Sequence, residues 1–210
     1  MSKLAELGHP VTDRIVDMIA SGSLERAERI KEVEVSEKLG VSRIPLREAM
    51  RALASQGVLE ARERGGMNVR AFTAAQIQEL SDVRAALEPI AMRAAVPALQ
   101  EKPNRIALNA IIEEMKWAVE QRDRRGIAAA DIYFHNFLIE LSANDLIRNI
   151  WSGLRLQMQI VFRLELCVPT SLEQVVPKHL ALRDVLFRGD LGGLEAVVAD
   201  HVRPELNPST

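Results

Sequence analysis

Residues 39–53 read LGVSRIPLREAMRAL, and this stretch decides the fold of the first third of the chain. A glycine after Leu39 is a typical stop for a short helix, which we expect from Val33 to Leu39. Ser42 is a favoured N-cap for the next helix, which we expect from Arg43 to Gln56. Pro45 lies in the first turn of that helix, where it removes no internal hydrogen bond. The stretch therefore predicts two helices joined by a tight turn.

The helix that begins at Arg43 has two faces of different chemistry. Its apolar stripe, which we expect to pack inward, consists of Leu46, Ala49, Met50 and Leu53. Arginines recur at positions 43, 47 and 51, about 110° around the helix from that stripe. An arginine there can bind a phosphate through two hydrogen bonds, or read guanine O6 and N7 in the major groove. This face predicts DNA contact through Arg43, Arg47 and Arg51, although an arginine stripe alone is more often a solvated helix face.

The elements around these two helices complete a winged helix. We expect a first helix from Thr12 to Ile19. Two strands are expected after the helical segment, at Val58–Arg62 and Met67–Ala71, and the turn between them contains Gly65 and Gly66. Three helices followed by a hairpin is the winged-helix order. The glycine tip is small enough to let the wing approach a minor groove closely.

The chain after residue 72 is expected to be entirely helical. Thr73 and Gln76 form a capping box that marks the start of a second domain. Breakers that include Pro97, Pro103 and Pro169 separate the helical segments that follow. We expect about six of these segments, at residues 74–96, 104–123, 126–142, 145–166, 176–188 and 192–203. The sequence thus predicts a mostly α protein, with a winged helix-turn-helix domain over 1–72 and an antiparallel helical bundle over 73–210.

Charge and composition narrow the class of protein. The net charge of the whole chain is −2, but residues 43–72 carry six arginines and three acids, which gives a local surface of +3. Cys167 is the only cysteine, so no CxxC metal or redox motif exists. The first 16 residues lack the apolar region of a secretory signal, and no apolar run approaches the roughly 20 residues that span a bilayer. We therefore expect a cytoplasmic protein with no membrane partner.

Histidines of the second domain suggest a metal site. Asp131 and His135 are four residues apart, so both project from one face of a helix. His179 and His201 are each 11 residues from Asp190, at the centre of the turn between their helices. In an antiparallel pair both would lie about 16 Å from that turn and stand level. One carboxylate and three imidazoles suit Zn²⁺, Ni²⁺ or Mn²⁺ with room for an exogenous ligand, although ordinary core or surface histidines are the simpler interpretation.

Two stretches in the first domain carry a resemblance to a known family. Residues 37–53, EKLGVSRIPLREAMRAL, and then Gly57-Val58-Leu59 resemble the LAxxLGVSRxPVREALxxLxxxGLV signature of GntR-family regulators. The resemblance implies that Arg43 and Arg47 contact operator DNA and that Gly66 touches the minor groove. A frequent arginine of the family, early in the second helix, is Val33 here, which suggests a divergent operator. Ser42, Pro45 and Arg51 are assigned to the same DNA-binding surface.

A second resemblance covers the rest of the chain. Residues 131–138, DIYFHNFL, and the histidine motifs at 178–182 and 200–202 are similar to those of the FCD sensor domain. Many members of that subgroup hold a divalent metal through one aspartate and three histidines. The resemblance implies that zinc, or alternatively nickel or manganese, is bound here by Asp131, His135, His179 and His201.

The two resemblances together imply a ligand-responsive transcription regulator and not an enzyme. We expect a homodimer on a pseudo-palindromic, double-stranded operator, acting as a repressor by the habit of the family. The effector is expected to be a small organic acid beside the metal, with Arg84 or Arg155 binding its far end. A structural salt bridge from Arg84 to Glu88 is the competing interpretation of the first arginine. Two other functions stay open: a metal-dependent hydrolase with an accessory winged helix, and a sensor for which the metal itself is the signal.

Overall fold

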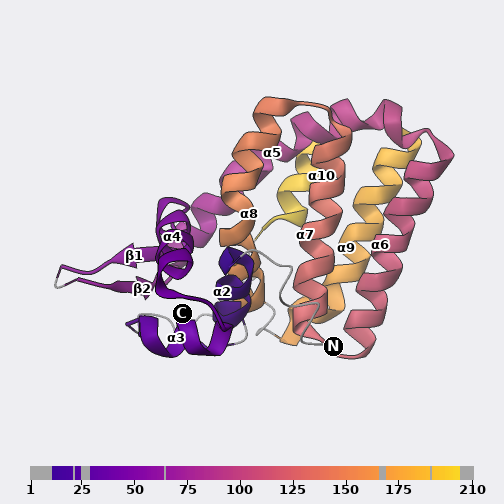
Figure 1. Cartoon of the computed structure of the whole chain (residues 1–210). Coiled ribbons are helices and arrows are strands. Elements are labelled where there is room, and N and C mark those ends of the chain that lie inside the picture. Colours follow the sequence, from indigo (N-terminus) through magenta and orange to yellow (C-terminus); the bar gives the residue numbers. More distant parts are fainter. Residues whose placement is uncertain are drawn as a thin grey trace. The chain divides into compact units, whose positions relative to one another are not determined.

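The chain divides into two compact units in the computed structural model, Met1–Ala71 and Phe72–Thr210, and each is described by itself (Figure 1). The structure describes residues 11–20, 22–24, 29–63, 65–165, 169–189 and 191–203. Cys167 and the turn residue Asp190 lie outside these ranges. Among the described residues, no helix combines the length and the apolar character that crossing a membrane requires.

The first unit is a winged helix-turn-helix, as predicted. Its helices are α2 (Val11–Ala20), α3 (Glu32–Leu39) and α4 (Arg43–Ser55), followed by strands β1 (Leu59–Ala61) and β2 (Met67–Val69). The helices pack because each buries an apolar stripe, and the fully buried side chains of the unit include Ile15, Val16, Leu46, Leu53, Val58 and Val69. The apolar stripe predicted for the third helix is therefore the core of the unit.

The turn between α3 and α4 sets the direction of α4. Gly40 has a φ of 63°, in the left-handed region, and its N–H donates to the carbonyl of Glu37 at 3.1 Å. This is the favoured conformation for a glycine that ends a helix. Ser42 occupies the N-cap position of α4 with extended backbone angles, but its side chain makes no capping hydrogen bond. The Ser42 hydroxyl therefore has no structural task at the helix end.

The wing has a contribution that the sequence pattern did not indicate. β1 and β2 pair antiparallel, with Leu59 opposite Val69. Arg29, which precedes α3, forms an antiparallel bridge with Asn68 on the outer side of β2. The N–H of Ile30 also donates to the carbonyl of Met67 at 2.9 Å. A short extended segment before α3 thus anchors the hairpin to the helices.

The second unit is a helical bundle of the predicted kind. Its helices are α5 (Ala74–Leu99), α6 (Lys102–Glu120), α7 (Arg124–Leu141), α8 (Asp145–Glu165), α9 (Pro169–Arg188) and α10 (Leu194–His201). Figure 1 shows α6, α7 and α9 side by side with nearly parallel axes. The predicted capping box is present, since Thr73 Oγ1 accepts from Gln76 N and Gln76 Oε1 accepts from Thr73 N. The interior side chains include Met92, Leu99, Leu108, Met115, Phe134, Leu138, Leu182 and Leu186.

Prolines interrupt the helices less than the sequence pattern predicted. α5 continues through Pro97 to Leu99, and α9 begins at Pro169 and runs through Pro177. An internal proline removes one backbone hydrogen bond and crowds the preceding turn. The apolar face of α5 stays buried on both sides of Pro97, at Ala95 and Leu99, and this packing holds the helix together. The predicted ends at 96 and start at 176 were therefore wrong.

Candidate functional site

The arginine face of α4 is open to solvent. Arg43, Arg47 and Arg51 are all exposed, whereas Leu46 and Met50 on the opposite face are buried. Arg47 Nε donates to Glu32 Oε2 on α3 at 2.8 Å. Two neighbouring helices thus hold one guanidinium in place while leaving it accessible.

The wing tip presents a small, strained backbone beside a basic side chain. Gly66 has a φ of 90°, and a Cβ added there would lie 3.3 Å from Arg29 Nε. Arg62, the residue after β1, donates from Nη1 to Asn68 Oδ1 on β2 at 2.8 Å. Only glycine combines this backbone angle with the close approach of Arg29. Val33, at the position where the family often has an arginine, is 46% exposed.

The structure brings the four predicted metal ligands together inside the bundle. Asp131 and His135 lie on α7, His179 on α9 and His201 at the end of α10. One ligand atom from each of the four lies within 4.8 Å of every other. The rings of His179 and His201 are 4.5 Å apart between centroids, as their equal spacing from the turn predicted.

The outer nitrogens of two imidazoles are fixed by acceptors. His135 Nδ1 lies 2.7 Å from Glu88 Oε2 on α5, and His179 Nδ1 lies 2.7 Å from the carbonyl oxygen of Val175. A ring nitrogen that faces an acceptor carries the proton, so in the neutral imidazole the other nitrogen carries the lone pair. With Nδ1 held in this way, Nε2 is the atom that each neutral imidazole can offer to a cation.

Both Nε2 atoms have polar neighbours at short range. His179 Nε2 lies 3.0 Å from Asp131 Oδ1, and His135 Nε2 lies 3.0 Å from His201 Nε2. Among the described residues, no hydrogen bond reaches Asp131 Oδ2 or His201 Nδ1, although both atoms are buried. Buried polar atoms without partners are costly. A cation among these four side chains would satisfy them, because each would then donate a lone pair to it.

The ionisation of the cluster suits a cation. Burial opposes the charge on Asp131, but hydrogen bonding to His179 and nearby positive groups outweigh it, so the pKa of Asp131 lies below its usual value. Burial, together with the adjacent imidazoles, moves the pKa of His201 well below the usual histidine value. The cluster therefore holds a carboxylate and a neutral imidazole at neutral pH, which are the protonation states of metal ligands.

A buried ion pair supports the cluster from α5. Arg84 Nε donates to Glu88 Oε1 at 2.6 Å, and the side chains are 3% and 0% exposed. Burial raises the pKa of Glu88, but the positive Arg84 and the adjacent His135 outweigh burial, and the net pKa is lowered. The salt-bridge interpretation of Arg84 is thus realised. The contact of Glu88 with His135 was missed at the sequence level, because no sequence spacing relates a residue on α5 to one on α7.

Two further side chains bear on what the cluster can bind. Arg155, predicted to bind an effector, is exposed on α8. Trp151, also on α8, is 1% exposed, and its ring centroid lies 6.1 Å from that of His135. Its Nε1–H has no hydrogen-bond partner among the described residues.

Two family comparisons and two relatives match this arrangement. The family described as bacterial regulatory proteins, gntR family, matches residues 7–69, and the FCD domain matches residues 79–204. The chain is 32% identical over 200 residues to the probable D-xylose utilization operon transcriptional repressor of Paenarthrobacter nicotinovorans, covering 95% of this chain and 87% of that protein. It is 31% identical over 141 residues to the gluconate operon transcriptional repressor of Bacillus subtilis, covering 67% of this chain and 57% of that protein.

Solved structures share the fold. The Escherichia coli protein McbR/YncC aligns with a TM-score of 0.79 at 22% identity, covering 96% of this chain and 94% of that one. A GntR-type regulator from Rhodococcus sp. RHA1 aligns with a TM-score of 0.77 at 21% identity, covering 91% of each chain. At these identities the likeness concerns the fold alone.

A winged helix-turn-helix followed by a helical bundle is the architecture of a DNA-binding transcription regulator. This chain belongs to the gntR family of bacterial regulatory proteins, in the subgroup with a C-terminal FCD domain. The family consists of regulators and not of enzymes, so the hydrolase alternative is wrong.

Proposed function

We propose that this regulator is a homodimeric repressor whose affinity for its operator changes when a small carboxylate binds beside a metal in the bundle. Relatives that are named repressors support the sign of the regulation. A dimer is expected because one winged helix reads only a half-site, and two-fold operators need two readers.

The DNA-binding part of the proposal rests on the open arginine face. Ser42, Arg43 and Pro45 begin α4, and Arg47 and Arg51 continue its exposed side. The first turns of such a helix enter the major groove in winged-helix proteins, and Gly66 reaches for the minor groove. The free hydroxyl of Ser42 is available for a phosphate because it does not cap its own helix.

The metal part of the proposal rests on one observation. Two pairs of candidate ligand atoms, His179 Nε2 with Asp131 Oδ1 and His135 Nε2 with His201 Nε2, lie 3.0 Å apart inside the bundle. A divalent cation among them would accept one lone pair from each of the four side chains. Zinc is the first candidate for three imidazoles and a carboxylate, and nickel or manganese are the others.

The effector part of the proposal follows from the surroundings of the cluster. Four protein ligands leave one or two positions on a five- or six-coordinate ion, where a carboxylate oxygen can bind. The Trp151 Nε1–H, which is buried without a partner among the described residues, would then donate to the effector. Arg155 is the predicted partner for its far end, while Arg84 would have to share its guanidinium between Glu88 and the effector.

The metal is tested by elemental analysis of protein purified without chelator. We expect about one divalent ion per chain in the parent and its loss in His135→Ala and His179→Ala. Glu79→Gln, an exposed carboxylate on α5, is the control that should keep the ion. A parent without metal, whose melting temperature ignores both chelator and added zinc or nickel, would contradict the metal site.

The DNA surface is tested separately. The Arg43→Ala, Arg47→Ala double variant should lose about 1–3 kcal/mol of operator affinity for each base-reading arginine. Lys102→Ala, which removes an exposed cation of the bundle, should bind as the parent does. Equal binding by the double variant would refute this surface, and a mass near 23.4 kDa by light scattering, with or without operator, would refute the dimer.

A further inference from the structure

A hollow on the outside of the bundle is distinct from the histidine cluster. It lies between α6 and α7 and has a volume of about 530 Å³. The described residues that line it are Glu114, Trp117, Ala118, Gly126, Ala129, Ala130 and Tyr133. None of the four candidate metal ligands is among them. Neither the DNA surface nor the proposed carboxylate site uses this hollow.

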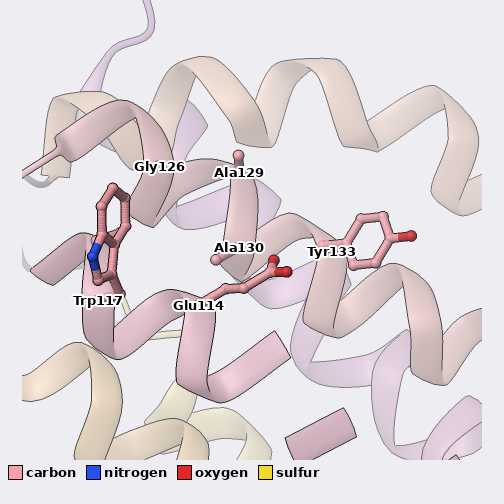
Figure 2. Close-up of a pocket in the computed structure, with 7 residues that line it drawn as sticks. Glu114, Trp117, Gly126, Ala129, Ala130 and Tyr133 are labelled. Atoms are coloured by element: carbon pink, nitrogen blue, oxygen red, sulfur yellow. The ribbon is translucent and has the colours of Figure 1, made fainter. Parts of the chain in front are cut away.

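Two aromatic side chains border the hollow and are open to solvent. Trp117 is 61% exposed and Tyr133 is 62% exposed. Such exposure is unusual for large rings, which bury most of their surface when nothing else requires them outside. Figure 2 shows the indole of Trp117 at one end and the ring of Tyr133 at the other. Both rings can therefore contact a molecule that enters between them.

A single carboxylate gives the hollow its charge. Glu114 is the one charged side chain among the described residues that line it. Figure 2 shows the Glu114 carboxylate between the two aromatic side chains. Glu114 makes no ion pair or hydrogen bond with any part of the chain that the structure describes, whereas its neighbour Glu113 pairs with Lys116 at 2.6 Å. The negative charge of Glu114 is thus available to a ligand.

The floor of the hollow is made of small residues. Gly126, Ala129 and Ala130 on α7 leave room that larger side chains would fill. A Cβ at position 126 would lie 2.7 Å from Asp123 Oδ2 and 3.1 Å from Ala118 Cβ, so the glycine is required for the approach of α7 to α6. An apolar body of a few carbon atoms can lie on this floor.

We propose that the hollow binds a small organic cation, an alkyl- or arylammonium. The ammonium group would pair with Glu114, and its carbon body would lie on the alanine floor between Trp117 and Tyr133. Aromatic faces attract cations through their quadrupole, and a carboxylate adds Coulomb attraction. An anion would meet Glu114 with like charge, and a neutral body would gain only apolar contact.

The position of the hollow joins it to the histidine cluster through one helix. Tyr133 lies two residues after Asp131 and two before His135 on α7, and its exposed ring faces away from their buried side chains. A cation in the hollow therefore contacts the helix that carries half of the candidate metal ligands. The regulator would receive a second chemical input on the opposite face of α7.

The test uses the two tryptophans as separate reporters. The chain has only Trp117 and Trp151, so an NMR spectrum of the ¹⁵N-labelled full chain contains two indole N–H signals. Three probes share one skeleton and differ in charge: 2-phenylethylammonium, 2-phenylethanol and phenylacetate. We expect the ammonium to shift the Trp117 signal in a saturable manner, the alcohol to shift it at higher concentration, and phenylacetate to leave it unchanged.

Matched variants separate charge from shape. Glu114→Gln keeps the size of the side chain and should weaken 2-phenylethylammonium about fivefold, as expected for an exposed ion pair, while leaving 2-phenylethanol unaffected. Glu113→Gln, the control on the same turn, should bind the ammonium as the parent does. Equal shifts by all three probes, no shift of Trp117, or a shift of Trp151 alone would each overturn the proposal. It would also fail if the Trp117 signal moved with protein concentration alone, because a second copy would then cover the hollow.

Discussion

Replacement of Glu88 by glutamine tests how the bundle holds its cluster. The carboxylate accepts from two donors at once, Arg84 Nε at 2.6 Å and His135 Nδ1 at 2.7 Å. Glutamine has the same shape but only one acceptor oxygen, and its amide N–H₂ must face the other donor. Glu88→Gln therefore leaves either the arginine or the histidine without its acceptor inside the bundle.

The expected cost follows from the burial of the pair. Removing one partner of a buried ion pair costs about 3–5 kcal/mol, and the lower end applies because glutamine leaves no cavity and keeps one hydrogen bond. For a chain of this length about 3 kcal/mol corresponds to a fall in melting temperature of roughly 6–12 °C. Loss of an orienting acceptor behind a metal-binding histidine also weakens metal binding by about 10–100-fold.

Two assays separate these effects. Thermal unfolding in the presence of chelator measures the stability of the metal-free protein, and competition with a chromogenic chelator measures zinc affinity. Glu79→Gln, an exposed carboxylate earlier on α5, should change stability by less than about 0.5 kcal/mol. A Glu88→Gln variant that melts within about 2 °C of the parent and binds zinc equally well would show that Glu88 neither stabilises the bundle nor orients His135.

Three further predictions concern other parts of the chain. Leu53→Ala removes a fully buried side chain of the first unit and should lower the stability of that unit by about 2–5 kcal/mol. Circular dichroism should then show early helix loss, while the melting curve from tryptophan fluorescence, which reports the second unit alone, should stay unchanged. A matching shift of the fluorescence curve would contradict this. Gly66→Ala forces a side chain onto a φ of 90° and against Arg29, and urea unfolding of the first unit should show a loss of about 1–2 kcal/mol, with an unchanged midpoint as the opposing result. Burial and adjacent imidazoles lower the pKa of His201 well below its unfolded value of 6.5, so the unfolded chain binds more protons than the folded chain below pH 6.5. The free energy of unfolding of the metal-free protein should therefore fall as the pH is lowered from 7.5 to 5.5. The fall should be smaller in His201→Gln, and an equal fall would exclude His201 as its source.

Local signals in the sequence predicted the element order well. The glycine after Leu39 and the serine at position 42 bracket a turn whose geometry depends on neighbouring residues alone, and the capping box at Thr73 is equally local. The proline positions misled because their effect depends on the surrounding packing. Pro97 sits between buried Ala95 and Leu99, and only the folded bundle shows that this packing outweighs the lost hydrogen bond.

The four candidate metal ligands could be predicted from the sequence, but the residues that hold those ligands in place could not. His179 and His201 could be placed level because equal distances from a turn fix their height in an antiparallel pair. The contact of Glu88 with His135 joins residues 47 positions apart on two helices, and no spacing rule relates α5 to α7. The bridge of Arg29 with Asn68 was hidden for the same reason, since it pairs a segment before α3 with a strand beyond α4.

The length of α5 connects the start of the second unit with the support of the histidine cluster. Its 26 residues run from the capped end at Thr73, four positions after the last residue of β2, past Glu88 in the interior. A helix is stiff against twisting, so a rotation imposed at Glu88 reappears at Thr73, about 22 Å away along the axis. A rotation of about 20° would carry each backbone Cα, at a radius of about 2.3 Å, through roughly 0.8 Å. A change of less than an ångström behind His135 can thus be passed along α5 to its N-cap at Thr73, at the start of the second unit.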